Sequence, residues 1–173
     1  GVSNNWLIYL ADSRVDFTKQ NLVGPGKILM LELNTAPSDG KVLPAGTFNV
    51  LNPMEITAAA SLTPFTVVPG LPAEDGSIYG TWYLATDTQG GDFQPLCGAQ
   101  KGTVSVKKTG DTYTIDFDIT DDDFKISVKG SYTGKPYIHD GTANTTSVST
   151  RAAAASGKAL NIHKSARRQA FRK

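Results

Sequence analysis

The chain has 173 residues, a net charge of +1 and one cysteine, Cys97. This length suffices to bury a hydrophobic core without disulfides, and a lone cysteine excludes an internal disulfide and a zinc–thiolate cluster. No stretch approaches the roughly 20 apolar residues of a membrane-spanning helix. The high glycine content is typical of turn-rich all-β proteins.

Charge divides the chain into two parts. Residues 1–140 contain all 16 acidic side chains and ten basic ones, whereas residues 141–173 contain seven basic side chains and no acidic one. We predict a β domain over 1–140, followed by a linker and a basic C-terminal segment in which residues 158–163 supply a last strand. Docking on the acidic body, or solvation, is favoured over nucleic-acid binding, because Phe171 is the segment's one stacking aromatic.

Strand-length apolar runs recur along the β domain. Residues 6–10 predict a strand, and residues 27–34 predict a strand covered on both faces. Phe48 and Val50 are expected to face inward. Residues 65–68 predict a short edge strand within a proline-rich connection, and residues 78–86 predict a further strand.

The clearest pattern is a three-stranded meander over residues 102–134. Apolar and polar residues alternate along 112–119 and 124–132, which predicts strands with one buried face. A hairpin loop at 120–123 would pair Ile119 with Phe124 and place Asp118 opposite Lys125. Together these elements predict an all-β fold, an antiparallel β-sandwich or partly closed β-barrel with a basic C-terminal extension.

Acidic and nucleophilic residues are the candidates for a metal site or a catalytic site. Asp121, Asp122 and Asp123 suggest calcium binding, but the EF-hand pattern fails, so a solvated hairpin turn is favoured. No metal or cofactor is expected. The two histidines, His139 and His163, and Cys97 lack the flanking motifs of a hydrolase, so we expect no catalytic residues.

Aromatic residues offer the best binding hypothesis, because sugar rings stack on exposed aromatic faces. Residues 78–86 carry aromatics on both faces of the predicted strand. The predicted ligand-binding residues are therefore Tyr79, Tyr83 and Trp82, with Tyr79 and Tyr83 favoured if Trp82 belongs to the core.

The meander, together with the upstream LPAGTFNV, resembles exported β-rich proteins and lipoproteins of gut Bacteroidetes. The shared pattern is Tyr113-x-Ile115-x-Phe117-x-Ile119-x-Asp121-Asp122, then a strand ending in Gly130-x-Tyr132-x-Gly134. The resemblance covers roughly residues 40–134. It implies export to the periplasm or outer-membrane surface, with membrane attachment through an N-terminal lipid outside this chain, and it carries over no catalytic residues.

We therefore expect a non-catalytic exported protein that binds a glycan, lipid or protein, or that forms part of a cell surface. Two alternatives remain open. One is a hydrolase that acts on a glycan or peptide. The other is an assembly or adhesion subunit that uses an exposed sheet edge.

Overall fold

The computed structural model describes residues 3–11, 15–16, 21–22, 26–56, 63–86 and 94–136. Apart from one 3-10 helix, Pro53–Glu55, the regular structure of these residues is β-strand, so the all-β prediction is confirmed. The segment 141–173, with its predicted last strand, lies outside the described residues, as do His139 and His163.

Nine strands of the described part form one sheet, and four short strands form two separate pairs. In chain order the strands are β1 (Asn4–Ala11), β2 (Val15–Asp16), β3 (Asn21–Leu22), β4 (Gly26–Thr35), β5 (Gly46–Val50), β6 (Thr66–Val67), β7 (Leu71–Pro72), β8 (Ile78–Tyr79), β9 (Trp82–Thr86), β10 (Gln94–Gly98), β11 (Lys101–Thr109), β12 (Thr112–Asp121) and β13 (Ile126–Gly134).

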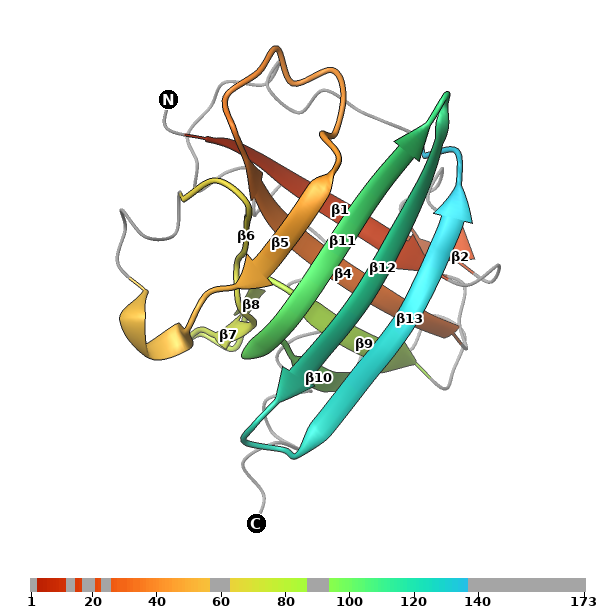
Figure 1. Cartoon of the computed structure of the whole chain (residues 1–173). Helices are drawn as coiled ribbons and strands as arrows, with labels where there is room; N and C mark the ends of the chain where they lie inside the picture. Colours follow the sequence, from red (N-terminus) through yellow and green to blue (C-terminus); the bar gives the residue numbers. More distant parts are fainter. Residues whose placement is uncertain are drawn as a thin grey trace.

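The large sheet is curled into an open half-barrel. Its strand order is β10-β9-β4-β6-β5-β11-β12-β13, and β1 pairs with the other edge of β4. In Figure 1, β5, β11, β12 and β13 lie in front and cross over β1, β4, β9 and β10 behind them. The inner faces of these two layers enclose the main core, as in crossed sheet packings.

Strand β4 is covered on both faces, as its sequence predicts. Leu29, Leu31 and Leu33 point into the main core together with Phe48, which is fully buried. On the opposite face, Ile28 forms a second, smaller cluster with buried Trp82 and Leu84 and with partly buried Met30, Ala11 and Ile78.

The prediction of an edge strand at residues 65–68 is wrong, because β6 lies inside the sheet. It pairs antiparallel with β4 through Leu33 and Asn34, and parallel with β5 through Asn49 and Val50. The backbone of Phe65 has a positive φ of 59°, and its N–H donates to Asn34 O at 2.7 Å. The turn at Phe65 places the two-residue strand β6 between β4 of the rear layer and β5 of the front layer. Strand β6 therefore connects the two layers.

The predicted register of the last hairpin is also wrong. Ile119 pairs with Val128 and Asp118 with Lys129, and the turn occupies residues 122–125. The cause is the Asp121 side chain, whose Oδ1 accepts hydrogen bonds from the N–H groups of Asp123 and Phe124, both at 3.0 Å. This local capping delays the chain reversal by two residues.

The corrected register places Phe117 opposite Gly130. A Cβ atom at Gly130 would lie 2.5 Å from Phe117 Cζ. We expect Gly130→Ala to reduce the free energy of unfolding by about 1–3 kcal/mol, because the Phe117 ring must shift against the core. Urea denaturation measures the effect. The double variant with Phe117→Leu should lose less stability than the sum of the two single variants, because the two residues are in contact. Strictly additive losses in the free energy of unfolding would contradict this explanation.

Candidate functional site

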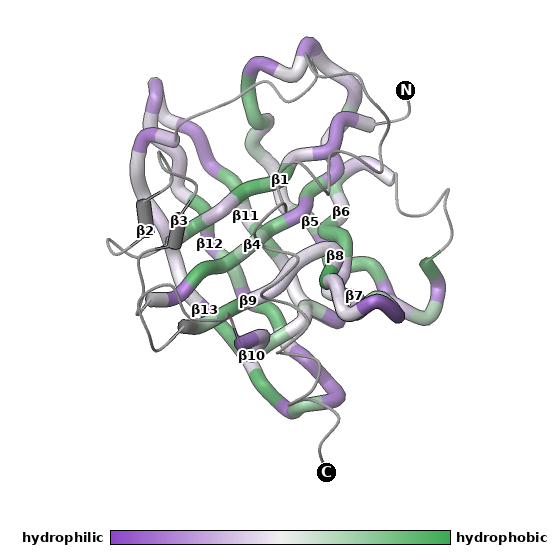
Figure 2. The backbone as a smooth tube through the Cα atoms, turned by 180° about the vertical axis from the view of Figure 1, so that it is seen from behind, coloured by the Kyte–Doolittle hydropathy of each residue, from purple (hydrophilic) through white to green (hydrophobic). Residues whose placement is uncertain are grey.

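The candidate site lies on the outer face of the layer formed by β1, β4 and β9. Figure 2 shows this layer from behind, with hydrophobic stretches on β1 and β4. Register pairs Asn5 with Asn34, Leu7 with Glu32 and Tyr9 with Met30 on this face. We define the outer-face site as Asn5, Leu7, Tyr9 and Glu32, together with Tyr79, whose neighbour in the chain, Gly80, donates a hydrogen bond to Glu32.

The centre of the outer-face site is the half-buried carboxylate of Glu32. Gly80 N donates to Glu32 Oε2 at 3.1 Å, and Asn5 Nδ2 donates to Glu32 Oε1 at 3.1 Å. One donor is on β1 and the other lies between β8 and β9, so both carboxylate oxygens are fixed by distant segments of the chain. Each oxygen keeps further acceptor capacity, so a ligand hydroxyl group can add a hydrogen bond to a preorganised acceptor.

A break between β8 and β9 brings Gly80 to Glu32. The ladder between β4 and β9 ends at the pair of Met30 and Trp82. Two residues before Trp82, the backbone of Gly80 has a φ of +79°. Glu32 N donates a hydrogen bond to Thr81 Oγ1 at 3.0 Å. This side-chain bond holds the segment before β9 to β4 where the backbone ladder has ended. A positive φ favours glycine, so this residue type permits the turn that directs the N–H at the carboxylate.

Two large side chains of β1 flank the carboxylate. Leu7 is exposed and lies directly opposite Glu32, and Tyr9 is 40% exposed one position along the same face. The pKa of the Tyr9 phenol is raised, first by burial and then by the negative charge of Glu32. Tyr9 thus stays neutral at physiological pH and presents an apolar ring face beside a polar acceptor.

The three aromatic residues predicted from the sequence do not gather on one surface. Tyr79 is 48% exposed at the end of β8. Trp82 is only 6% exposed and belongs to the second cluster, with its Nε1 donating to Tyr79 O at 2.8 Å. Tyr83 points to the other face of β9 and packs, half-buried, against the main core. Of the three, Tyr79 alone has a large exposed surface.

The ligand-binding residues predicted from the sequence did not include Asn5, Tyr9 or Glu32. The alternation of Asn5, Leu7 and Tyr9 with inward-facing residues was visible in principle, because period two separates the faces of a strand. The position of Glu32 was not visible, since its partner Gly80 is 48 residues away in the chain.

The aspartate-rich turn is built differently from a solvated loop. Asp121 is only 2% exposed, and its Oδ2 accepts from Gly98 N at 2.9 Å, in addition to the two bonds to Oδ1. Asp122 pairs with Lys101, and Asp123 accepts from Gln100 Nε2 at 2.5 Å. Within the described ranges no group of three or more acidic, histidine or cysteine side chains is placed to hold a metal ion.

Cys97 is buried in the main core, and its pKa is raised to about 11. Burial is the largest cause, followed by the charge of Asp121, and a hydrogen bond between the Cys97 thiol and the Asp121 backbone opposes the shift. A nucleophilic cysteine requires the thiolate, so this environment is that of an inert, structural thiol.

We expect Cys97 to react slowly with iodoacetamide at pH 8 in the folded protein, because the thiol is both protonated and covered. Labelling in denaturing urea should be complete under the same conditions. Mass spectrometry at timed intervals measures both rates. Rapid labelling of the native protein would contradict the description of Cys97 as inert.

The chain was compared with protein-family models, with curated proteins and with solved structures, and nothing matched. The resemblance to exported Bacteroidetes proteins therefore stays a prediction. In the part of the chain that the structure describes, no helix is long and apolar enough to cross a membrane. The structure defines the class of the protein as an all-β half-barrel with a polar and aromatic patch on its outer face.

Proposed function

We propose that the protein is a non-catalytic binding module and that its outer-face site binds a carbohydrate. The observation that carries the proposal is the fixed Glu32 carboxylate beside exposed Leu7 and Tyr9 of β1, with Tyr79 next to Gly80 in the chain. Saccharides present hydroxyl groups that donate to carboxylates, and C–H faces that pack against aromatic rings.

Chemistry favours this ligand class over a lipid. A lipid chain needs an enclosed apolar cavity, whereas the outer-face site combines exposed apolar groups with a carboxylate and the exposed Asn5 amide. Mixed polar and aromatic surfaces of this kind suit flat, hydroxyl-rich ligands. Export to a cell surface, as the sequence predicts, would place such a module where glycans are abundant.

A glycan array followed by calorimetric titration of the best saccharide tests the proposal. We expect Tyr79→Ala and Tyr9→Ala each to reduce affinity by about 1–2 kcal/mol, which is about five- to thirtyfold in Kd. Glu32→Gln should also weaken binding, because the amide offers one acceptor oxygen instead of two.

The matched control is Phe124→Ala, because Phe124 is an equally large, 54% exposed aromatic residue in the turn after β12. Its removal should leave affinity unchanged. Thermal melting of every variant checks that the fold is kept. A silent array, or equal losses in the outer-face and control variants, would refute carbohydrate binding at this site.

Self-assembly is a second candidate, favoured by one specific observation. Among the described residues no strand pairs with the outer edge of β1, although all eight of its residues pair with β4. Free edges can pair with a second copy of a chain. Light scattering over a range of concentrations would detect such a dimer, and Leu7→Lys should weaken it.

A further inference from the structure

Glu32 supplies the charge of the outer-face site. The strands β1, β4 and β9 that form this layer contain two charged residues, Lys27 and Glu32. Side chains alternate between the faces of a strand, so Lys27 lies on the face of Leu29 and away from Glu32. Among the described residues no basic side chain forms an ion pair with the Glu32 carboxylate. Its two hydrogen-bond donors are neutral amides, which hold the carboxylate in place but leave its negative charge unbalanced.

The hydrogen-bond donors around Glu32 are already used inside the fold. Asn5 Nδ2 donates to Glu32 Oε1 at 3.1 Å and to Asn34 Oδ1 at 3.2 Å. A side-chain amide nitrogen has two N–H groups, so Asn5 Nδ2 has none left for a ligand. Asn34 Nδ2 in turn donates to buried Thr66 Oγ1 at 3.1 Å. The groups that remain open to a ligand at this centre are therefore acceptors, namely the carboxylate oxygens and Asn5 Oδ1.

A negative charge surrounded by acceptors matches an ammonium group. A primary ammonium has three N–H donors, and Glu32 Oε1, Glu32 Oε2 and Asn5 Oδ1 are three acceptors. Hydrogen bonds between charged partners are about twice as strong as those between neutral ones. Tyr9, which is 40% exposed on the same face, adds an aromatic ring that attracts a cation. Calcium is a poorer match, because it takes about six to eight oxygen ligands.

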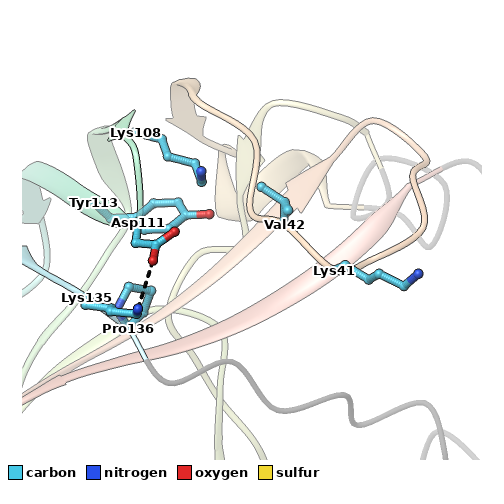
Figure 3. Close-up of a pocket in the computed structure, with 7 residues that line it drawn as sticks. All are labelled: Lys41, Val42, Lys108, Asp111, Tyr113, Lys135 and Pro136. Carbon is cyan, nitrogen blue, oxygen red and sulfur yellow. Dashed lines mark hydrogen bonds and ion pairs between the residues drawn. The ribbon is translucent and has the colours of Figure 1, made fainter.

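A shallow pocket at the β11–β12 turn has the opposite charge character. Three lysines, Lys41, Lys108 and Lys135, line it together with one acidic residue, Asp111 (Figure 3). Asp111 is paired with Lys135 at 2.8 Å. This excess of positive charge repels a cation, so an amine-bearing ligand is favoured at the outer-face site and disfavoured at this pocket.

We propose that the outer-face site prefers saccharides that carry a protonated primary amine, such as unacetylated hexosamine units, and that Glu32 and Asn5 bind the ammonium group. This inference rests on the proposed carbohydrate binding and names the substrate class of the same site. Acetylation of the amine removes its charge and two of its donors, so N-acetylated units bind more weakly. Uronic acid units are repelled by the Glu32 carboxylate.

Calorimetric titration of the full chain with three matched tetrasaccharides tests the inference. The three are β-1,4-linked tetramers of glucosamine, N-acetylglucosamine and glucose. At pH 6 and low ionic strength, we expect the glucosamine tetramer to bind about tenfold or more tightly than the glucose tetramer. At pH 9 the sugar amine has lost its charge, so the two affinities should become similar. Added salt at pH 6 should also reduce the preference, because it screens the attraction between the charges.

Glu32→Gln removes the charge and keeps the size of the side chain. The ratio of the two affinities at pH 6 should fall close to one in this variant. The matched control is Asp118→Asn, which removes an exposed carboxylate that pairs with Lys129 at 2.9 Å on the solvent face of β12. The control should keep the wild-type ratio. Thermal melting checks the fold of both variants, and if Glu32→Gln does not fold, the comparison of pH 6 with pH 9 on the wild type decides alone.

The outcomes separate this inference from the proposed function. Equal affinity for the glucosamine and glucose tetramers at pH 6 would overturn the amine preference and leave carbohydrate binding in place. A preference that survives in Glu32→Gln, or that persists unchanged at pH 9, would also overturn it. Lack of binding of the glucosamine tetramer, with another saccharide binding on the array, would do the same. Lack of binding of every saccharide would refute both proposals.

Discussion

Substitution of Asp121 by alanine is expected to reduce the free energy of unfolding by about 3–5 kcal/mol. The buried carboxylate accepts hydrogen bonds from three backbone N–H groups, those of Gly98, Asp123 and Phe124. Alanine would leave all three unpaired. The bond to Gly98 also ties β10 of the rear layer to the end of β12 in the front layer, so its loss should loosen the half-barrel.

Urea denaturation monitored by tryptophan fluorescence measures the effect. Asp121→Asn should cost less than alanine, because one amide oxygen can still cap the turn. The matched control is Asp118→Ala, since Asp118 is exposed and pairs with Lys129 at 2.9 Å on the solvent face. Surface ion pairs contribute about 1 kcal/mol or less. Similar losses at Asp118 and Asp121 would contradict this account.

Gly80→Ala should have an effect of comparable size. The backbone of Gly80 has a φ of +79°, and a Cβ atom there would lie 1.8 Å from the carbonyl oxygen of Pro69. Because the clashing atom belongs to the backbone, the clash can be removed only if the β8–β9 segment moves. We expect a loss of more than about 3 kcal/mol in the free energy of unfolding. Where the fold survives, saccharide binding should fail because the N–H no longer orients Glu32.

Gly110→Ala is the control for the backbone conformation alone. Gly110 also has a positive φ, +58°, but nothing lies within 4 Å of a Cβ atom there. Its substitution should therefore cost only about 1 kcal/mol. Thermal and urea unfolding of both variants separate conformational strain from the clash with Pro69. Equal losses would mean that the close approach at Gly80 is relieved without cost.

Local pattern in the sequence was enough to predict the long strands. The alternation in β12 and the double-sided apolar run of β4 are properties of consecutive residues, and both strands are found where they were expected. The turn glycine at 110 was predictable for the same reason, because its conformation depends only on its neighbours in the β11–β12 hairpin.

Features that depend on distant partners were missed. Strand β6 has two residues, too few for a periodic pattern, and its place between β4 and β5 comes from contacts with both. The register of β12 and β13 was missed because Asp121 is a buried cap rather than a solvated turn residue. At the outer-face site, Glu32 looked like a polar interruption in an apolar strand until Asn5 and Gly80 were placed beside it.

The most direct test of the central claim is an amide NMR titration of the full chain with the saccharide that binds best on the array. We predict that the largest shift changes will fall on Asn5, Leu7, Tyr9 and Gly80, with little change at Gly110 and Asp111 in the β11–β12 turn. Changes concentrated in the β11–β13 meander, or no change at saturating saccharide, would contradict carbohydrate binding on the outer face.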